Sequence, residues 1–208
     1  LCNMHNRGQT NWCTTLKAIL QETNKMHLWN EQNITERQFQ QIKESLYKDF
    51  MTMTLEQIND SDSNPKLRTY KLFKHQFQFE SFLSTPTNLN YALSLTKFRI
   101  SSHNLAIETG RYTKPKTQIQ DRLCIHCNHK EIETEQHFLL ACPLYNEERI
   151  LLMETLSLNI PELDNLENDG KFILIMSNRD KQVTDALGKF SFHSFKKRNQ
   201  IISRRLNK

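Results

Sequence analysis

The sequence predicts a mainly α-helical protein, and two observations support this prediction. Only 4 glycines and 5 prolines occur among the 208 residues, so few tight turns are available. Leucine, isoleucine, lysine, glutamate and glutamine recur at steps of three and four residues, as they do in helices with one buried face. A chain of this length forms one sizeable domain or two small ones, and folding buries roughly 70% of the surface that the unfolded chain exposes.

Two helices are expected in the first sixty residues. The first should place four apolar side chains on one face: Trp12, Leu16, Ile19 and Leu20. Thr35 and Gln38 have the spacing of a capping box, in which side chains satisfy exposed backbone amides of the first helical turn. The apolar residues that follow predict a long helix to about Asn59: Phe39, Ile42, Leu46, Phe50 and Met53.

Further helices are expected along the rest of the chain. Pro65 is favourable in a first helical turn, and the apolar face of the helix that it begins would be Leu67, Tyr70, Phe73 and Phe77. The later elements are a helix at 89–100, a short segment capped by Ser102, a loop at 111–122, a helix at 143–158, a linker at 161–170, an apolar run at 172–176 and a last helix from about Lys181.

The net charge of +5 is concentrated at one end of the sequence. Residues 189–208 contain seven lysines or arginines and no acidic residue, so the other 188 residues carry 21 basic and 23 acidic groups, a net charge of −2. Such a block attracts phosphate, and acidic lipid or an acidic protein would suit it equally. No run of roughly 18 apolar residues and no signal peptide is apparent, so we expect an intracellular protein of the nucleus and cytoplasm with no membrane partner.

Three of the five cysteines lie within 19 residues, beside a histidine, in the pattern Cys124-x2-Cys127-x9-His137-x4-Cys142. Thiolates and one imidazole suit one tetrahedral Zn²⁺ ion, and four protein ligands leave no position for a catalytic water, so the metal should be structural. Binding would then contribute to folding, on the order of 10 kcal/mol. The redox alternative for Cys124 and Cys127 is weaker because no βαβ pattern surrounds them.

Other donors near this pattern leave the ligand assignment open. His126 and His129 are rival ligands, although the His-x4-Cys spacing favours His137. Cys2 and Cys13 have no partner motif and are expected to be small buried or terminal thiols.

No catalytic motif is apparent, and we expect that this chain alone is not an enzyme. Asp60 and Asp62 are the nearest candidates for a magnesium-binding carboxylate cluster, but they lie in a stretch of turn composition. No glycine-rich phosphate loop occurs.

Basic residues are mixed with aromatic residues in two regions, which favours contact with a nucleic-acid backbone. The expected phosphate contacts are Lys97, Arg99, Arg111, Lys196, Lys197, Arg198, Arg204 and Arg205. The alternative is a solvated helix face, with Phe98, Phe192 and Phe195 in the core.

Three segments together resemble the zinc-binding C-terminal region of non-LTR (LINE-type) retrotransposon reverse transcriptases. They read LTKFRISSHNLAIETGRY at 95–112, RLCIHCN at 122–128 and EIETEQHFLLACPLYNEER at 131–149. Cys124, Cys127, His137 and Cys142 match the ligand positions of that family. The resemblance covers about a quarter of the chain closely, and the polymerase palm of the family is missing from it.

The resemblance implies an RNA-directed DNA polymerase as the parent protein. Its polymerase core would be a partner, and the zinc region would bind template RNA or target DNA. We expect a helical, thumb- or linker-like segment at 1–86, a zinc-binding region of hairpin and helix at 87–160, and a basic helical segment at 161–208. The alternative is a structural or protein-interaction zinc domain that does not bind nucleic acid.

Overall fold

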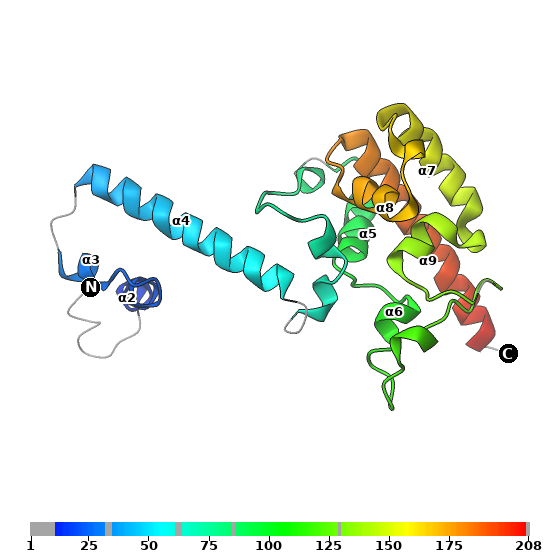
Figure 1. Cartoon of the computed structure of the whole chain (residues 1–208), viewed down its shortest axis with the longest axis horizontal. Coiled ribbons are helices and arrows are strands. Elements are labelled where there is room, and N and C mark those ends of the chain that lie inside the picture. The colour runs from blue at the N-terminus through cyan, green and yellow to red at the C-terminus, as the bar shows by residue number, and fades with distance from the viewer. Residues whose placement is uncertain (1–10, 32–34, 61–63, 85, 129, 207–208) are drawn as a thin grey trace. The chain divides into compact units, whose positions relative to one another are not determined.

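The computed structural model describes residues 11–31, 35–60, 64–84, 86–128 and 130–206. It falls into two compact units, one up to Glu56 and one from Gln57 onward. Within the described residues every regular element is a helix or a helical turn, and the mainly helical fold class is confirmed (Figure 1). The three-part division at 86/87 and 160/161 remains a prediction.

The first unit is built from α2 (Trp12–Glu22), α3 (Met26–Asn30) and most of α4 (Glu36–Asn59). The capping box that starts α4 is confirmed. The backbone N–H of Thr35 donates to Gln38 Oε1 at 2.9 Å, and the N–H of Gln38 donates to Thr35 Oγ1 at 3.3 Å. These two bonds satisfy amides that have no partner inside the first turn, so the helix begins where the sequence predicts.

Among its described residues, the second unit contains four α-helices of ten or more residues together with shorter helical segments. The longer helices are α5 (Leu89–Arg99), α7 (Asn146–Asn159), α8 (Asn168–Ser177) and α9 (Lys181–Leu206). The shorter segments are η1 (Pro65–Leu67), η2 (Tyr70–Leu72), η3 (Ser81–Leu83), α6 (Ala106–Thr109), η4 (Ile119–Asp121), η5 (His137–Ala141), η6 (Pro143–Tyr145) and η7 (Leu163–Asn165).

The helix expected from Pro65 is replaced by the short turns η1 and η2, so this prediction is wrong. Side chains in this segment bind distant partners. Tyr70 donates a hydrogen bond to Glu80 at 3.2 Å, and Lys74 pairs with the same carboxylate. The chain must reverse between residues 74 and 80 for these contacts to form, which a continuous helix does not allow.

Two other local predictions differ from the structure. The short helix α6 follows Leu105 as its cap residue, so Ser102 does not cap it. The stretch expected as a linker at 161–170 contains the turn η7, and α8 begins within it at Asn168.

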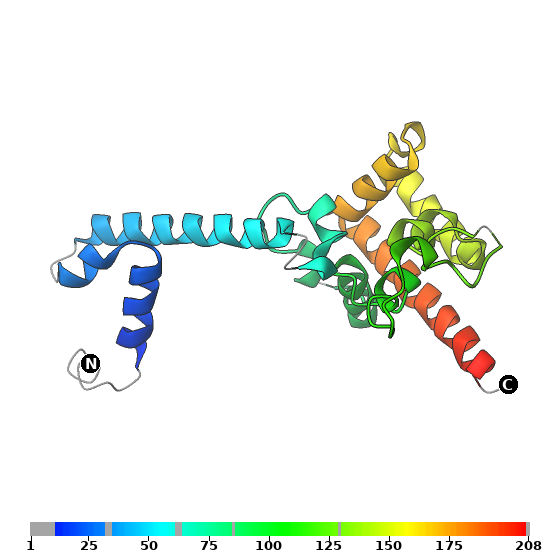
Figure 2. The ribbon, with the colours of Figure 1, turned by 60° about the horizontal axis from the view of Figure 1, so that its bottom comes forward.

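Helix α9 forms the centre of the second unit, where it packs against α5 and α7 (Figures 1 and 2). Gly188 allows a close approach, because a Cβ atom added there would lie 2.8 Å from the carbonyl oxygen of Tyr91 in α5. Phe138 lies in the core with ring centroids 5.3 Å from Phe98 and 4.5 Å from Phe195. Because Phe138 directly follows His137, the aromatic core fixes the backbone beside the cysteine cluster.

Within the described residues, none of the helices is both long and apolar enough to cross a lipid bilayer.

Candidate metal centre

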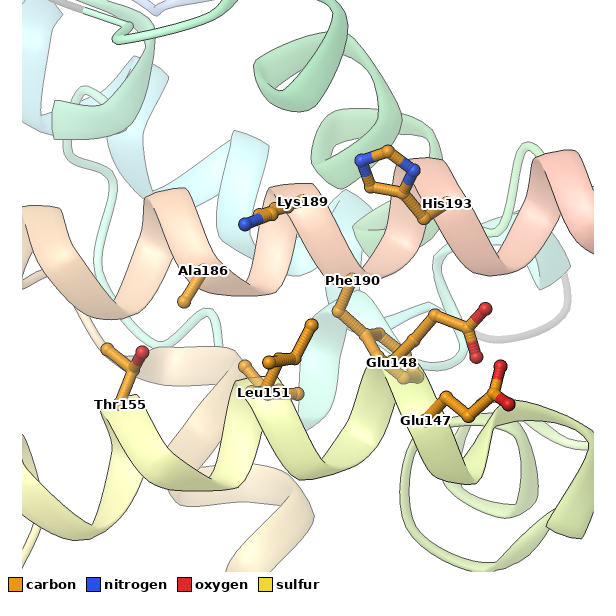
Figure 3. A pocket seen from close by; sticks show the side chains of 9 residues that line it. Glu147, Glu148, Leu151, Thr155, Ala186, Lys189, Phe190 and His193 are labelled. Carbon is orange, nitrogen blue, oxygen red and sulfur yellow. The ribbon is translucent and has the colours of Figure 1, made fainter.

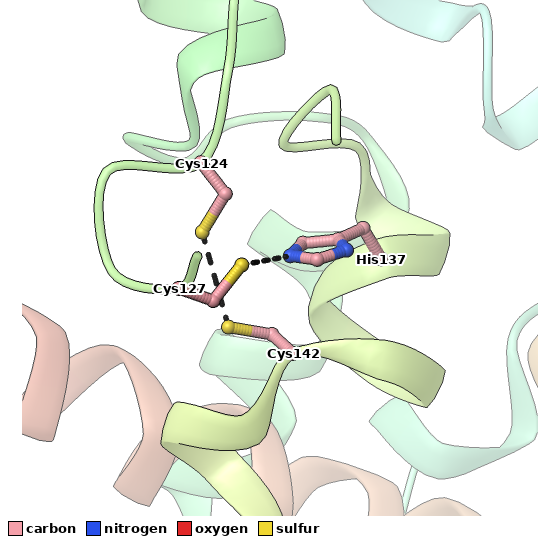
Figure 4. A group of neighbouring side chains, drawn as sticks. All are labelled: Cys124, Cys127, His137 and Cys142. Atoms are coloured by element: carbon pink, nitrogen blue, oxygen red, sulfur yellow. Dashed lines mark hydrogen bonds between the residues drawn. The ribbon is translucent and has the colours of Figure 1, made fainter. Parts of the chain in front are cut away.

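Cys124 and Cys127 lie on a tight hairpin. An antiparallel bridge pairs Leu123 with Ile132, and the N–H of Cys124 donates to the carbonyl oxygen of Glu131 at 2.8 Å. These backbone bonds hold the loop closed, so both thiols project from one short turn toward the same space (Figure 4).

His137 and Cys142 come from the first residue and the cap of η5, which is a single turn of π-helix. The N–H of Cys142 donates to the carbonyl oxygen of His137 at 2.8 Å, a bond that spans five residues. In an α-helix, side chains five residues apart lie about 140° apart around the axis, at 100° per residue. The wider π turn brings these two donors to one side, and π turns are frequent at functional sites.

The four side chains converge on one point. Their sulfur and nitrogen donor atoms all lie within 4.8 Å of one another. The Sγ atoms of Cys124 and Cys142 are 3.9 Å apart, and Cys127 Sγ is 3.5 Å from His137 Nε2 (Figure 4). Cys124, His137 and Cys142 are buried. The group could hold one metal ion.

Neighbouring side chains orient these donors. Glu131 Oε2 lies 2.7 Å from His137 Nδ1, so the carboxylate accepts the Nδ1 proton and leaves Nε2 facing the sulfurs. Arg149 donates to the carbonyl oxygens of Leu139 at 2.8 Å and Cys142 at 2.7 Å, which fixes the end of the π turn.

The donors share protons with one another. The hydrogen bond with Cys142, together with burial, raises the pKa of Cys124 to about 12, and the same bond lowers the pKa of Cys142. Burial lowers the pKa of His137, but its hydrogen bonds with Cys124 and Glu131 outweigh burial and raise the pKa to about 9. A metal ion binds thiolates and neutral imidazole, so binding would release these protons.

The structure separates the rival histidines. His137 belongs to the cluster and His126 does not. Burial, followed by the charges of Arg198 and Arg205, lowers the pKa of His126 to about 4. His126 Nε2 is buried, with no hydrogen-bond partner within the described residues. His129 and Cys2 lie outside those residues, as does Asp62, and Cys13 is buried in α2 of the first unit.

Two of the expected phosphate contacts are buried inside the protein, which corrects their assignment. Arg99 is 3% exposed, lies between the rings of Phe73 and Phe82, and donates to Glu80 at 2.8 Å. Arg198 is likewise 3% exposed and faces a buried carboxylate. Neither guanidinium group reaches a phosphate at the surface.

The other expected phosphate contacts differ in whether they form an ion pair with an acidic side chain. Arg111 pairs with Glu108 at 3.0 Å, and Lys197 lies 3.1 Å from Glu147. Four exposed residues form no ion pair within the described part of the chain: Lys97, Lys196, Arg204 and Arg205.

Acidic residues that the sequence pattern did not single out surround the cluster. Glu131 and Glu133 alternate along the returning arm of the hairpin. Glu131 holds His137, and the buried Glu133 lies with Oε1 3.7 Å from Cys124 Sγ. Their spacing of two residues in an extended stretch was the available signal, because side chains two residues apart there point to the same face.

A separate cleft of about 390 Å³ lies between α7 and α9 (Figure 3). Glu147 and Glu148 stand at one end of it, and Lys189 and His193 lie on its α9 wall. The two carboxylates make this cleft unfavourable for phosphate groups.

Comparisons with known proteins identify no relative of the chain. No protein-family model, no curated protein and no solved structure matches it.

Proposed function

We propose that this chain is a zinc-stabilised module that binds RNA or DNA, from the C-terminal part of a non-LTR retrotransposon reverse transcriptase. The convergence of Cys124, Cys127, His137 and Cys142 carries the proposal, because it joins donors from two separate segments. The assignment to the retrotransposon family rests on the resemblance of residues 95–149.

Two of the distances between donors match those of a zinc site. Zinc bonds of about 2.3 Å to sulfur and about 2.0 Å to nitrogen place tetrahedral ligands about 3.8 Å apart for two sulfurs and about 3.5 Å apart for sulfur and nitrogen. The corresponding separations here are 3.9 Å for Cys124 and Cys142, and 3.5 Å for Cys127 and His137. With four protein ligands, the ion would hold the hairpin to the π turn and would have no open position for a substrate.

The nucleic-acid part of the proposal is supported by the exposed cations. Lys97 lies on α5, and Lys196, Arg204 and Arg205 lie on the second half of α9. Exposed ammonium and guanidinium groups without acidic partners attract phosphates and release counterions when they bind.

We also propose that the chain does not catalyse a reaction by itself. The cysteine cluster is the one group of His, Cys, Asp or Glu donors within the described residues that is placed to hold a metal ion. Nucleotide incorporation on a primed template by the purified chain would contradict this.

Metal content tests the zinc assignment. We expect one zinc per chain in the wild type, and less than about a tenth of that in Cys124→Ser and His137→Ala. His126→Ala is the matched control and should keep its zinc. Full zinc in His137→Ala together with loss in His126→Ala would overturn the ligand assignment.

Binding to labelled nucleic acids tests the second part. The zinc-loaded chain should bind RNA or DNA in fluorescence anisotropy, with an affinity whose logarithm falls linearly with the logarithm of salt concentration. Absence of binding at low salt by folded, zinc-loaded protein would favour a structural or protein-interaction domain.

A further inference from the structure

A groove of about 920 Å³ runs between α5 and the second half of α9. Lys97 and Ser94 of α5 line one wall, and Lys196 and Gln200 of α9 line the other. The groove therefore brings together two of the exposed cations, which are 99 residues apart in the sequence.

The electrostatic character of this groove favours an anion. Neither Lys97 nor Lys196 forms an ion pair within the described residues, and no acidic side chain lines the groove there. The cleft between α7 and α9 differs, since Glu147 and Glu148 line it beside Lys189. Helix α9 thus presents one cationic groove and one cleft of mixed charge.

The uncharged lining adds hydrogen-bonding groups to the two lysines. Four amide side chains line it: Asn90, Asn104, Asn199 and Gln200. Three hydroxyl side chains join them: Ser94, Ser102 and Ser203. Asn104 Nδ2 donates to Asn199 Oδ1 at 2.7 Å, which ties the 102–104 segment to α9. Amides and hydroxyls bond both phosphate oxygens and base edges.

Apolar side chains complete the surface. Leu93 is 48% exposed, and Phe192 and Phe195 are partly buried along the α9 wall. Grooves that bind single strands combine cations that follow the backbone with apolar or aromatic surfaces for the bases.

The packing of the helices limits what can enter. Gly188 and the backbone of Tyr91 hold α9 close to α5, and helices in contact have axes about 8–10 Å apart. A double helix, whose major groove alone is about 12 Å wide, cannot enter a groove between two such helices. The backbone of one strand can.

We propose that the groove between α5 and α9 binds a single strand of RNA or DNA, with phosphates on Lys97 and Lys196 and bases against the apolar wall. This inference rests on the proposed nucleic-acid function and assigns it to one surface. Its tests use the zinc-loaded full chain and short labelled single strands of RNA and of DNA, with the matching duplexes.

The first test removes the two lysines. Lys97→Gln/Lys196→Gln should weaken single-strand binding at least about tenfold near 0.1 M salt and reduce the salt slope by about 1.4, or about 0.7 for each phosphate lost. The control Lys171→Gln/Lys189→Gln makes the same change of charge outside the groove and should leave both quantities near wild type. Equal losses in the two double variants would overturn the assignment to the groove.

The second test adds a negative charge with little change of shape. Asn199→Asp retains the oxygen that accepts from Asn104 and places a carboxylate between the lysine-bearing walls. It should weaken binding about tenfold, whereas Gln182→Glu, seventeen residues and about 26 Å earlier on α9, should have little effect. Wild-type affinity in Asn199→Asp would contradict the proposal.

The outcomes distinguish failure of the groove assignment from failure of the proposed function. If the wild type binds nucleic acid and both groove variants bind it with wild-type affinity, the assignment of binding to the groove is wrong and the proposed function stands. If the wild type binds no nucleic acid, both fail. Duplexes that bind as tightly as single strands, with the same loss in the groove variants, would overturn the single-strand assignment. Tighter binding of single strands than of duplexes supports the single-strand assignment, whether RNA or DNA is preferred.

Discussion

Glu133 and Arg198 form a buried, two-pronged ion pair between the cysteine hairpin and α9. Arg198 Nη2 lies 2.9 Å from Glu133 Oε2, and Nη1 binds the other carboxylate oxygen. The N–H of Ala106 also donates to Glu133 Oε2, at 2.6 Å, and Arg198 Nη2 donates to the carbonyl oxygen of Asn104 at 3.0 Å. One carboxylate therefore joins the hairpin, the start of α6 and the last helix.

Removal of Arg198 should be strongly destabilising. In Arg198→Met the buried carboxylate of Glu133 loses its counter-charge, and breaking such a pair costs about 3–5 kcal/mol. The free energy of unfolding from denaturant titration measures this loss. The double variant Glu133→Gln/Arg198→Met should lose less unfolding free energy than the sum of the losses in the two single variants. An unchanged free energy of unfolding in Arg198→Met would contradict the buried ion pair between Arg198 and Glu133.

Glu131 should tune metal affinity without being a ligand. Glu131→Ala removes the acceptor that orients His137, and changes of this kind typically weaken metal binding about 10–100-fold. Competition with a zinc chelator gives the affinity, with the exposed Glu162→Ala as control. Equal affinities in the two variants would exclude an orienting role for Glu131.

Two glycines in helices should respond in opposite ways to alanine. At Gly188 a new Cβ meets the backbone of Tyr91, and overpacking of about 1–3 kcal/mol should outweigh the gain of about 1 kcal/mol in helix propensity. At Gly170 the nearest atom is the Leu166 Cβ at 3.4 Å, so Gly170→Ala should be neutral or stabilising. Thermal unfolding distinguishes the two, and a more stable Gly188→Ala would contradict close packing of α5 on α9.

The pair of Glu80 and Arg99 should make stability depend on pH. Burial raises the pKa of Glu80, but the hydrogen bond from Lys74 and the charge of Arg99 outweigh it and hold the pKa below its usual value. This stabilisation is present above the usual glutamate pKa, near 4.5, and is lost as pH falls through the folded pKa. The difference in unfolding free energy between wild type and Glu80→Gln should therefore be largest near pH 7 and shrink below pH 4.5. A difference that stays constant with pH would contradict the ion pair.

The sequence predicted well those features that local residues determine. The capping box of Thr35 and Gln38 starts α4 as expected, and the helices near 89–100 and from Lys181 are found in the structure. The spacing of Cys124, Cys127, His137 and Cys142 predicted their convergence, because two donors on a tight turn and two on one helical turn need a single long-range contact to meet.

Predictions that depended on distant partners failed. Arg99 and Arg198 stood in basic stretches, but their carboxylate partners are 19 and 65 residues away in the sequence. No local pattern distinguishes an arginine that faces such a partner from one that faces solvent. The same holds for Tyr70 and Lys74, whose contacts with Glu80 replace the expected helix with turns.

The central position of α9 has a consequence for the order in which the second unit assembles. Its contacts with α5 join residues about a hundred positions apart, as between Tyr91 and His193, and the Arg198 pair closes a loop of 65 residues. Contacts of such long range slow folding, because the entropy of closing the long intervening loop is lost before the contact forms. During synthesis we therefore expect Phe98 and Phe138 to lack the ring contacts that α9 supplies until residues 181–206 have left the ribosome, and the nascent chain to be most prone to aggregation in that interval.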